Sequence, residues 1–298
     1  KTGRARWSFT AEGPIRFAPH IDGRKCYLAS DDGWVYCLAS DTGRHQWSFR
    51  AAPNDRQFVG DGRVISRWPC RSGVLVSDGI AYVVAGMWPS EGIYIYALDA
   101  RTGKTRWVND TSGAQYMAYP HGGAYALGGV APQGYLLASK DVLLVPTGRG
   151  IPAAFDRRTG KFLYFHSAVN KHNGGCWASI SGNLFFNQSH ARGVDEHIRI
   201  GRSGPRAGDG MLAFDIAEGK RLWGIGNRQR VVADSNTLFA LGGGVAEALE
   251  LKEGVKGELK WSTPHGHAWS AARSSNAFLI GGEAGVTALS TADGKALW

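Results

Sequence analysis

Residues 97–107 read ALDARTGKTRW, and variants of this phrase recur along the whole chain. Close copies are VYCLASDTGRHQW at 35–47, MLAFDIAEGKRLW at 211–223 and VTALSTADGKALW at 286–298, and weaker copies cover 151–164 and 245–261. Each copy joins an apolar run, a short polar turn and an aromatic residue that starts another strand. Self-similarity of this kind is typical of repeat architectures.

The spacing of the aromatic anchors predicts the architecture. Six units lie between the successive anchors Trp7, Trp47, Trp107, Tyr164, Trp223, Trp261 and Trp298. Each unit also contains a hairpin with alternating apolar residues around a glycine turn, so it holds about four short strands. We therefore predict an all-β fold, a β-propeller of four-stranded blades, with six repeat units.

Composition supports this fold class and narrows the partners. The 42 glycines argue against long helices, and the formal net charge of +9 favours anionic partners. The arginines are scattered and form no basic tract, so nucleic acid is not expected. The sequence has no apolar run long enough for a transmembrane segment.

The two ends bear on domain organisation. Residues 1–7 and 293–298 are copies of the same turn and strand start, so both cannot occupy one position in a closed ring. We predict a single propeller domain over residues 1–298, as a fragment of a longer chain whose ring has seven or eight blades. A six-bladed ring with one frayed end is the alternative.

Three units carry long insertions, at 50–71, 109–133 and 189–210. If the strands of a blade are lettered A to D from the axis outward, the D-to-A and B-to-C links lie at one end. All three insertions are expected at this end, whereas the short A-to-B and Thr-Gly-Lys turns form a plain opposite face. Scaffolds commonly place binding residues on such loops.

Arginines and aromatic residues gather at the predicted mouth of the propeller. The candidate ligand-binding residues are Arg16, Arg67, Trp68, Arg71, Tyr119, His121, Trp177, His190, Arg230, His267 and Trp269. Such side chains can stack on sugars and make bidentate contacts with carboxylate, sulfate or phosphate groups. The expected partners are a glycan, an anionic small molecule or a protein.

The phrase at 97–107 resembles the tryptophan-docking repeat of PQQ-dependent alcohol dehydrogenases and of the outer-membrane assembly lipoprotein with the same type of propeller. The resemblance implies a PQQ-like β-propeller and a bacterial protein that works in the periplasm or outside the cell. It also implies a structural role for the anchor tryptophans, which would fill the wedge between blades.

Two functions remain open. We favour a non-enzymatic binding or scaffolding propeller that presents its basic, aromatic face. The alternative, which the resemblance implies, is a PQQ- and calcium-dependent alcohol or sugar dehydrogenase. The adjacent cysteine pair of those enzymes is missing, and no calcium ligands can be aligned. We therefore predict no metal site, assign no catalytic residue, and keep PQQ with calcium as the cofactor of the alternative only.

Two of the four cysteines, Cys26 and Cys37, flank the turn at residues 30–33 and are expected to face each other across a hairpin. They could form a disulfide in an oxidising compartment. Two reduced, packed thiols are the favoured interpretation.

Overall fold

The computed structural model describes residues 4–60, 62–118, 125–147, 150–166, 173–189, 210–228, 230–252, 255–283 and 285–298. Strands dominate these residues, and their one helical element is the short 3₁₀ helix η1 (Pro89–Glu91). None of them belongs to a helix long and apolar enough to span a bilayer. The all-β prediction is confirmed.

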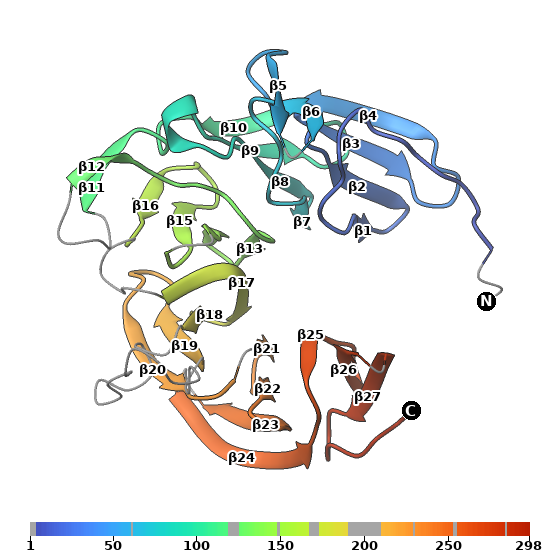
Figure 1. Ribbon diagram of the computed structural model, residues 1–298, viewed down its shortest axis with the longest axis vertical. Coiled ribbons are helices and arrows are strands. Elements are labelled where there is room, and N and C mark those ends of the chain that lie inside the picture. Colours follow the sequence, from blue (N-terminus) through green and yellow to red (C-terminus); the bar gives the residue numbers. More distant parts are fainter. Residues whose placement is uncertain are drawn as a thin grey trace. The chain divides into compact units, whose positions relative to one another are not determined.

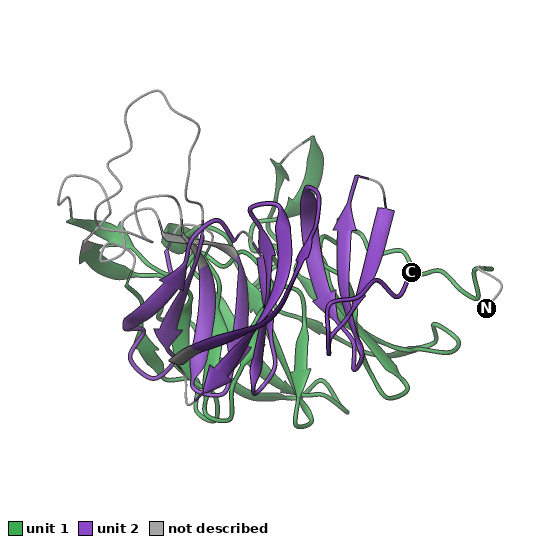
Figure 2. Ribbon diagram, turned by 90° about the horizontal axis from the view of Figure 1, so that it is seen from below, with its two compact units in different colours: residues 1–148, 152–168 green, residues 149–151, 169–298 purple. Residues whose placement is uncertain are grey.

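Contacts divide the chain into two compact units, residues 1–148 with 152–168 and residues 149–151 with 169–298 (Figure 2). Unit 1 contains three antiparallel four-stranded sheets in which the strands follow chain order (Figure 1). Their strands are β1 (His20–Asp22), β2 (Lys25–Ala29), β3 (Trp34–Ala39) and β4 (His45–Arg50); β7 (Leu75–Ser77), β8 (Ile80–Ala85), β9 (Tyr94–Asp99) and β10 (Thr105–Asn109); and β13 (Leu137–Ala138), β14 (Val142–Val145), β15 (Ala153–Asp156) and β16 (Phe162–Tyr164).

Unit 2 repeats the same order of strands in two four-stranded sheets and one three-stranded sheet. Their strands are β17 (Asn173–Ser181), β18 (Leu184–Ser189), β19 (Gly210–Asp215) and β20 (Arg221–Ile225); β21 (Arg230–Ala233), β22 (Thr237–Gly242), β23 (Val245–Lys252) and β24 (Val255–Pro264); and β25 (Ala268–Arg273), β26 (Ala277–Gly282) and β27 (Gly285–Ser290). Each sheet is one repeat, so these six sheets match the predicted six units.

The core lies between neighbouring sheets, and β8 shows why its sequence is almost continuously apolar. Ala81 and Val83 pack in the cluster shared with the first sheet. Tyr82 and Val84 point the other way, into the cluster shared with the third sheet. Because successive side chains of a strand alternate between faces, a sheet covered on both faces needs apolar residues at every position.

Four repeat phrases make the same contact with the tryptophan of the repeat before them. The indole Nε1 of Trp107 donates to the carbonyl oxygen of Arg157 over 3.1 Å, and the ring lies against Gly160. Equivalent pairs are Trp7 with Ser40 and Gly43, Trp47 with Ala100 and Gly103, and Trp261 with Thr291 and Gly294. Gly160 has a φ of 73°, and a Cβ atom there would lie 2.4 Å from Trp107 Cε3. Only glycine combines this turn with a ring so close.

The first hairpin corrects the expectation about the cysteines. Cys26 pairs with Leu38, and Cys37 pairs with Tyr27, so the two cysteines are one residue out of register. Their thiols therefore point to opposite faces of the sheet and cannot face each other. Both are buried free cysteines, and burial raises the pKa of the Cys37 thiol to about 11.

Two insertions form hairpins of their own. β5 (Gln57–Gly60) pairs with β6 (Arg63–Ser66) between β4 and β7, and β11 (Gln115–Ala118) pairs with β12 (Tyr125–Gly128) between β10 and β13. Both are D-to-A links, as predicted. The third insertion connects β18 to β19, which is a B-to-C link, and residues 190–209 lie outside the described residues.

Candidate functional site

A buried carboxylate joins two of the candidate arginines in unit 1. Asp31, in the turn between β2 and β3, is fully buried. Its Oδ2 lies 2.5 Å from Arg16 Nε, and its Oδ1 lies 3.0 Å from Arg71 Nε. Arg16 and Arg71 precede β1 and β7, so Asp31 ties together the entries to two neighbouring A strands. The arginine side chains are 30% and 20% exposed.

Arg67 and Trp68 hold the turn between β8 and β9. Trp68 Nε1 donates to the carbonyl oxygen of Glu91 over 2.7 Å, and Arg67 Nε donates to Glu91 Oε2 over 2.6 Å. The hydrogen bond from Arg67 holds the pKa of Glu91 below its ordinary value. Trp68 is 6% exposed, so its ring packs inside unit 1 and fixes η1 in place.

The two insertion hairpins meet on this same turn. Phe58 of β5 packs against Trp88, with ring centroids 5.1 Å apart, and β12 contacts η1. Gly129, just after β12, lies close to the segment that joins β10 to β11. A Cβ atom at Gly129 would be 2.4 Å from the carbonyl oxygen of Ser112. We call β5–β6, residues 88–91 and β11–β12 the hairpin platform. Its parts are anchored to one another and to the second sheet.

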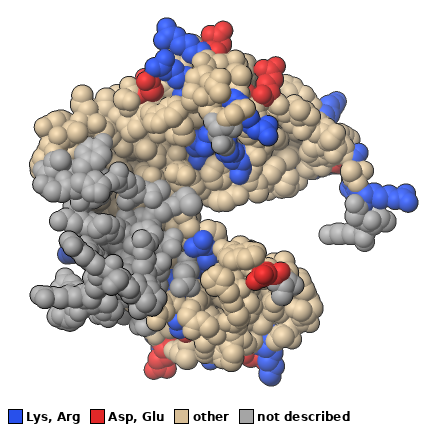
Figure 3. All heavy atoms as spheres, viewed as in Figure 1, with Lys and Arg blue, Asp and Glu red and all other residues tan. Residues whose placement is uncertain are grey.

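Large apolar side chains are exposed on the hairpin platform. Val59, Tyr116 and Leu127 are 74%, 70% and 76% exposed. The others are Val64, Trp88 and Tyr125. Figure 3 shows basic and acidic side chains interspersed over β5, β6 and η1. Exposed apolar residues bordered by charge are typical of protein interaction surfaces.

Three other candidates lie together in unit 2. Trp177, Arg230 and Trp269 come from β17, β21 and β25, the A strands of consecutive sheets. The Arg230 guanidinium lies 5.5 Å from the ring centroid of Trp177, and Arg230 Nε donates to the carbonyl oxygen of Trp269 over 3.2 Å. The Trp269 side chain is 56% exposed, so its ring is available for stacking. The exposed His267 lines a separate pocket of about 290 Å³ with residues 242–244.

The remaining candidates, Tyr119, His121 and His190, lie outside the described residues. Ligand binding by each residue of the predicted mouth stays a prediction.

Two observations on the described residues bear on the quinone and calcium of the alternative function. Within the described ranges no three His, Cys, Asp or Glu side chains gather as a metal site would require. The half-buried Trp177, which could floor a planar cofactor, already carries the Arg230 guanidinium over its ring.

Sequence reasoning missed the apolar part of the hairpin platform. The predicted mouth consists of arginine, histidine and aromatic residues and does not include Val59, Val64 and Leu127. A signal was available, because residues 57–66 read QFVGDGRVIS, two short apolar runs around an Asp-Gly turn. This pattern predicts a β-hairpin.

Fold and repeat together define the class: a β-propeller built from PQQ-like repeats. The chain belongs to the family described as outer membrane protein assembly factor BamB, whose profile matches residues 1–256.

Several relatives share this class. BamB from Moraxella catarrhalis is 16% identical, with a TM-score of 0.58 over 96% of this chain and 75% of that one. A quinohemoprotein alcohol dehydrogenase from Comamonas testosteroni is 15% identical, with a TM-score of 0.53 over 95% of this chain and 45% of that one. At these identities the likeness shows the fold alone.

A curated relative comes from the enzyme branch. A polyvinylalcohol dehydrogenase of Pseudomonas sp. is 26% identical over 166 residues, which is 54% of this chain. The match spans 24% of the length of that relative. The relatives therefore include both an outer membrane assembly factor and dehydrogenases. They do not decide between the scaffolding and the dehydrogenase function for this chain.

Proposed function

We propose that this chain is a non-enzymatic scaffolding propeller that recruits a protein partner on the hairpin platform. The observation that carries the proposal is the set of exposed apolar side chains on two hairpins that share one anchoring turn. Family membership suggests a partner in outer membrane protein assembly, and a location in the periplasm or outside the cell. We further propose that residues 1–298 are one propeller domain of a longer chain.

Two physical features support a protein partner over a small ligand. The platform carries large exposed apolar side chains on two separate two-stranded hairpins, whereas small-molecule sites are concave pockets that bury most of the ligand. Each hairpin is also a two-stranded sheet, so each has strand edges that a partner strand can extend. The arginines on Asp31 remain the proposed site for an acidic side chain of the partner, an anionic small molecule or a glycan.

Site-specific photocrosslinking in cells that express the full chain tests this proposal. A photoreactive residue at Leu127 or Val59 should capture one discrete protein, which mass spectrometry identifies. The control position is Leu259, which is 55% exposed on β24 of unit 2. Equal capture at Leu259, or no capture at either platform position, would overturn the proposal.

The dehydrogenase remains the second candidate because of the likeness to polyvinylalcohol dehydrogenase. Calorimetric titration with PQQ, with and without calcium, separates the two. Near-stoichiometric, calcium-dependent binding would establish the cofactor and justify assays with alcohols and an artificial electron acceptor. We expect no PQQ binding, and a panel of anionic and neutral oligosaccharides in the same assay tests the glycan proposal.

A further inference from the structure

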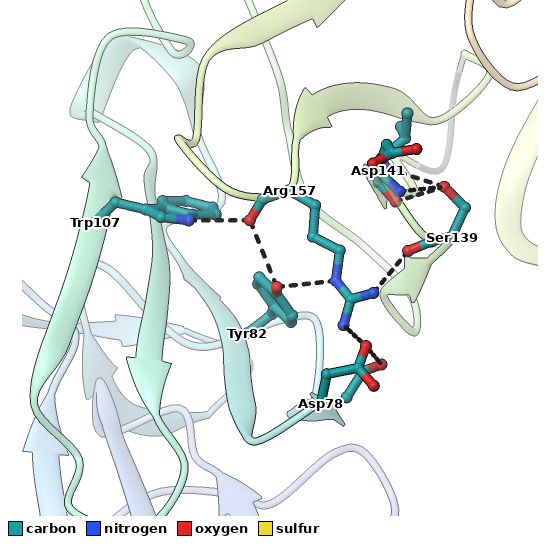
Figure 4. A network of polar contacts seen from close by, with 8 residues as sticks. Asp78, Tyr82, Trp107, Ser139, Asp141 and Arg157 are labelled. Carbon is teal, nitrogen blue, oxygen red and sulfur yellow. Dashed lines mark hydrogen bonds and ion pairs between the residues drawn. The ribbon is translucent and has the colours of Figure 1, made fainter.

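Another pocket lies at the end of unit 1 opposite the hairpin platform, among the short A-to-B and C-to-D turns. It has a volume of about 370 Å³ and opens between the second and third sheets. Its walls are Asp78, Ile80, Tyr82, Ala97, Arg106, Trp107, Lys140, Arg157 and Arg158. Figure 4 shows its inner part, where Trp107, Tyr82 and Asp78 converge on Arg157.

Arg157 stands where other repeats have a small or apolar residue. The equivalent positions, three residues before the turn glycine, hold Ser40, Ala100, Ile216 and Thr291. The wedge between sheets therefore closes without an arginine. A buried guanidinium is costly unless its donors are used, and Arg157, with a side chain 9% exposed, bonds Tyr82, Ser139 and Asp78 over 3.0, 2.8 and 2.7 Å. This repeat thus brings a fixed positive charge into the pocket wall.

Three further cations stand at the rim. Lys140 and Arg158 are exposed, and among the described residues neither has its side chain in an ion pair. Arg106 pairs with Asp99 over 2.6 Å and is 58% exposed. The lining contains four cations and one carboxylate, Asp78.

Asp78 offsets the charge of Arg157, with which it forms an ion pair over 2.7 Å, and leaves the charges of Lys140 and Arg158. Hydrogen bonds from Arg157 and then Ser77 hold its pKa below the ordinary value, so it is ionised and committed to Arg157 at neutral pH. Lys140 and Arg158 thus remain to bind an external anion. Between the cations the wall is apolar, formed by Ile80, Ala97 and the ring of Trp107.

We propose that this pocket binds a small organic anion, a phosphate or carboxylate group attached to an aromatic or aliphatic body. Lys140 and Arg158 hold the anionic group by charge-assisted hydrogen bonds, and the body packs on Ile80 and Trp107. The site is separate from the hairpin platform, which lies at the other end of the blades.

Isothermal titration calorimetry with four probes tests the proposal: 1-naphthyl phosphate, 1-naphthoate, inorganic phosphate and 1-naphthol. Inorganic phosphate measures the affinity that the charge alone provides, and 1-naphthol measures the affinity that the apolar body alone provides. We expect at least one naphthyl anion to bind about tenfold or more tightly than either part, and binding to weaken as salt is added. The two naphthyl anions distinguish phosphate from carboxylate.

Paired substitutions locate the binding. The double variant Lys140→Gln with Arg158→Gln changes exposed side chains only, and it should weaken binding about tenfold or more. The matched control is the double variant Arg4→Gln with Arg6→Gln, which removes the same charge from two exposed side chains that do not line the pocket. Unchanged affinity in the double variant, equal loss in the control, or no binding of either naphthyl anion would overturn the proposal. None of these outcomes bears on photocrosslinking at the hairpin platform.

Discussion

The indole nitrogen of Trp107 and the carbonyl oxygen of Arg157 are 3.1 Å apart although 50 residues separate them in the sequence. The bond joins the outermost strand of one sheet to the turn before the outermost strand of the next. It recurs in three other places in the described residues, each time with a glycine under the ring. The stability of the fold should therefore be sensitive to both partners of this contact.

Trp107→Ala should lower the free energy of unfolding by about 3 kcal/mol, because it leaves a cavity and removes an indole hydrogen bond. Urea unfolding followed by circular dichroism measures it. Trp269→Ala is the control, since this ring is 56% exposed and the change should cost less than about 0.5 kcal/mol. Equal stability of the two variants would contradict a role for Trp107 in holding the sheets together.

Gly160→Ala should cost about 2–3 kcal/mol, and Gly79→Ala about 1 kcal/mol. Both glycines have a φ of 73°, so the backbone strain is matched. They differ in surroundings, because the new Cβ at Gly79 meets nothing within 4 Å whereas at Gly160 it meets the Trp107 ring. The difference in their melting curves measures the ring contact alone, and identical curves would rule it out as a constraint.

Asp31→Ala should destabilise unit 1 by about 3 kcal/mol, because it leaves two half-buried guanidinium groups without their shared carboxylate. Asp41→Ala serves for comparison, since Asp41 is exposed and lies 3.8 Å from Arg24, a geometry worth less than about 0.5 kcal/mol. Thermal unfolding of both variants provides the measurement. A small effect at Asp31 would mean that the arginines find other partners.

Acid should weaken the fold partly through Asp99. Hydrogen bonds from Arg106 first, and then from Thr102, lower the pKa of this carboxyl to about 2. The folded pKa lies below the ordinary value, so the ionised carboxylate stabilises the folded chain above that value, and the stabilisation is lost as the pH falls toward about 2. Asp99→Asn should flatten the pH dependence of unfolding between about pH 4 and pH 2. An unchanged slope would show that Asp99 titrates alike in both states.

The sequence predicts the fold well because the same pattern of strands and turns recurs along the chain. The turn glycines at 43, 103, 160 and 294 and the tryptophans before them indicate the blades by spacing alone. The candidate site is harder to predict, because arginine and aromatic residues serve structure as readily as binding. Trp68 is an aromatic residue of the kind that stacks on ligands, yet its indole Nε1 donates to the carbonyl oxygen of Glu91. That hydrogen bond depends on a turn 23 residues away, which no local pattern reveals.

Arg157 in the third sheet is a second residue whose environment cannot be predicted from its local sequence. Arg157 belongs to a turn that reads as one more Thr-Gly-Lys copy, and its burial follows from Tyr82 and Asp78, residues of the neighbouring repeat. Aligning the repeats with one another would have marked it as the exception among Ser40, Ala100, Ile216 and Thr291. Differences between copies are thus more informative about binding than the features that they share.

The pairing of an indole in one repeat with a turn in the next also bears on how such a chain can change length. A repeat that makes this contact on both sides supplies one indole for its successor and one glycine turn for its predecessor, so duplicating or deleting such a repeat preserves the pairs. Gene duplication can therefore alter the number of blades without inventing a new interface. The hairpin platform and the pocket lined by Arg157, which depend on individual repeats, would be kept or lost as separate modules.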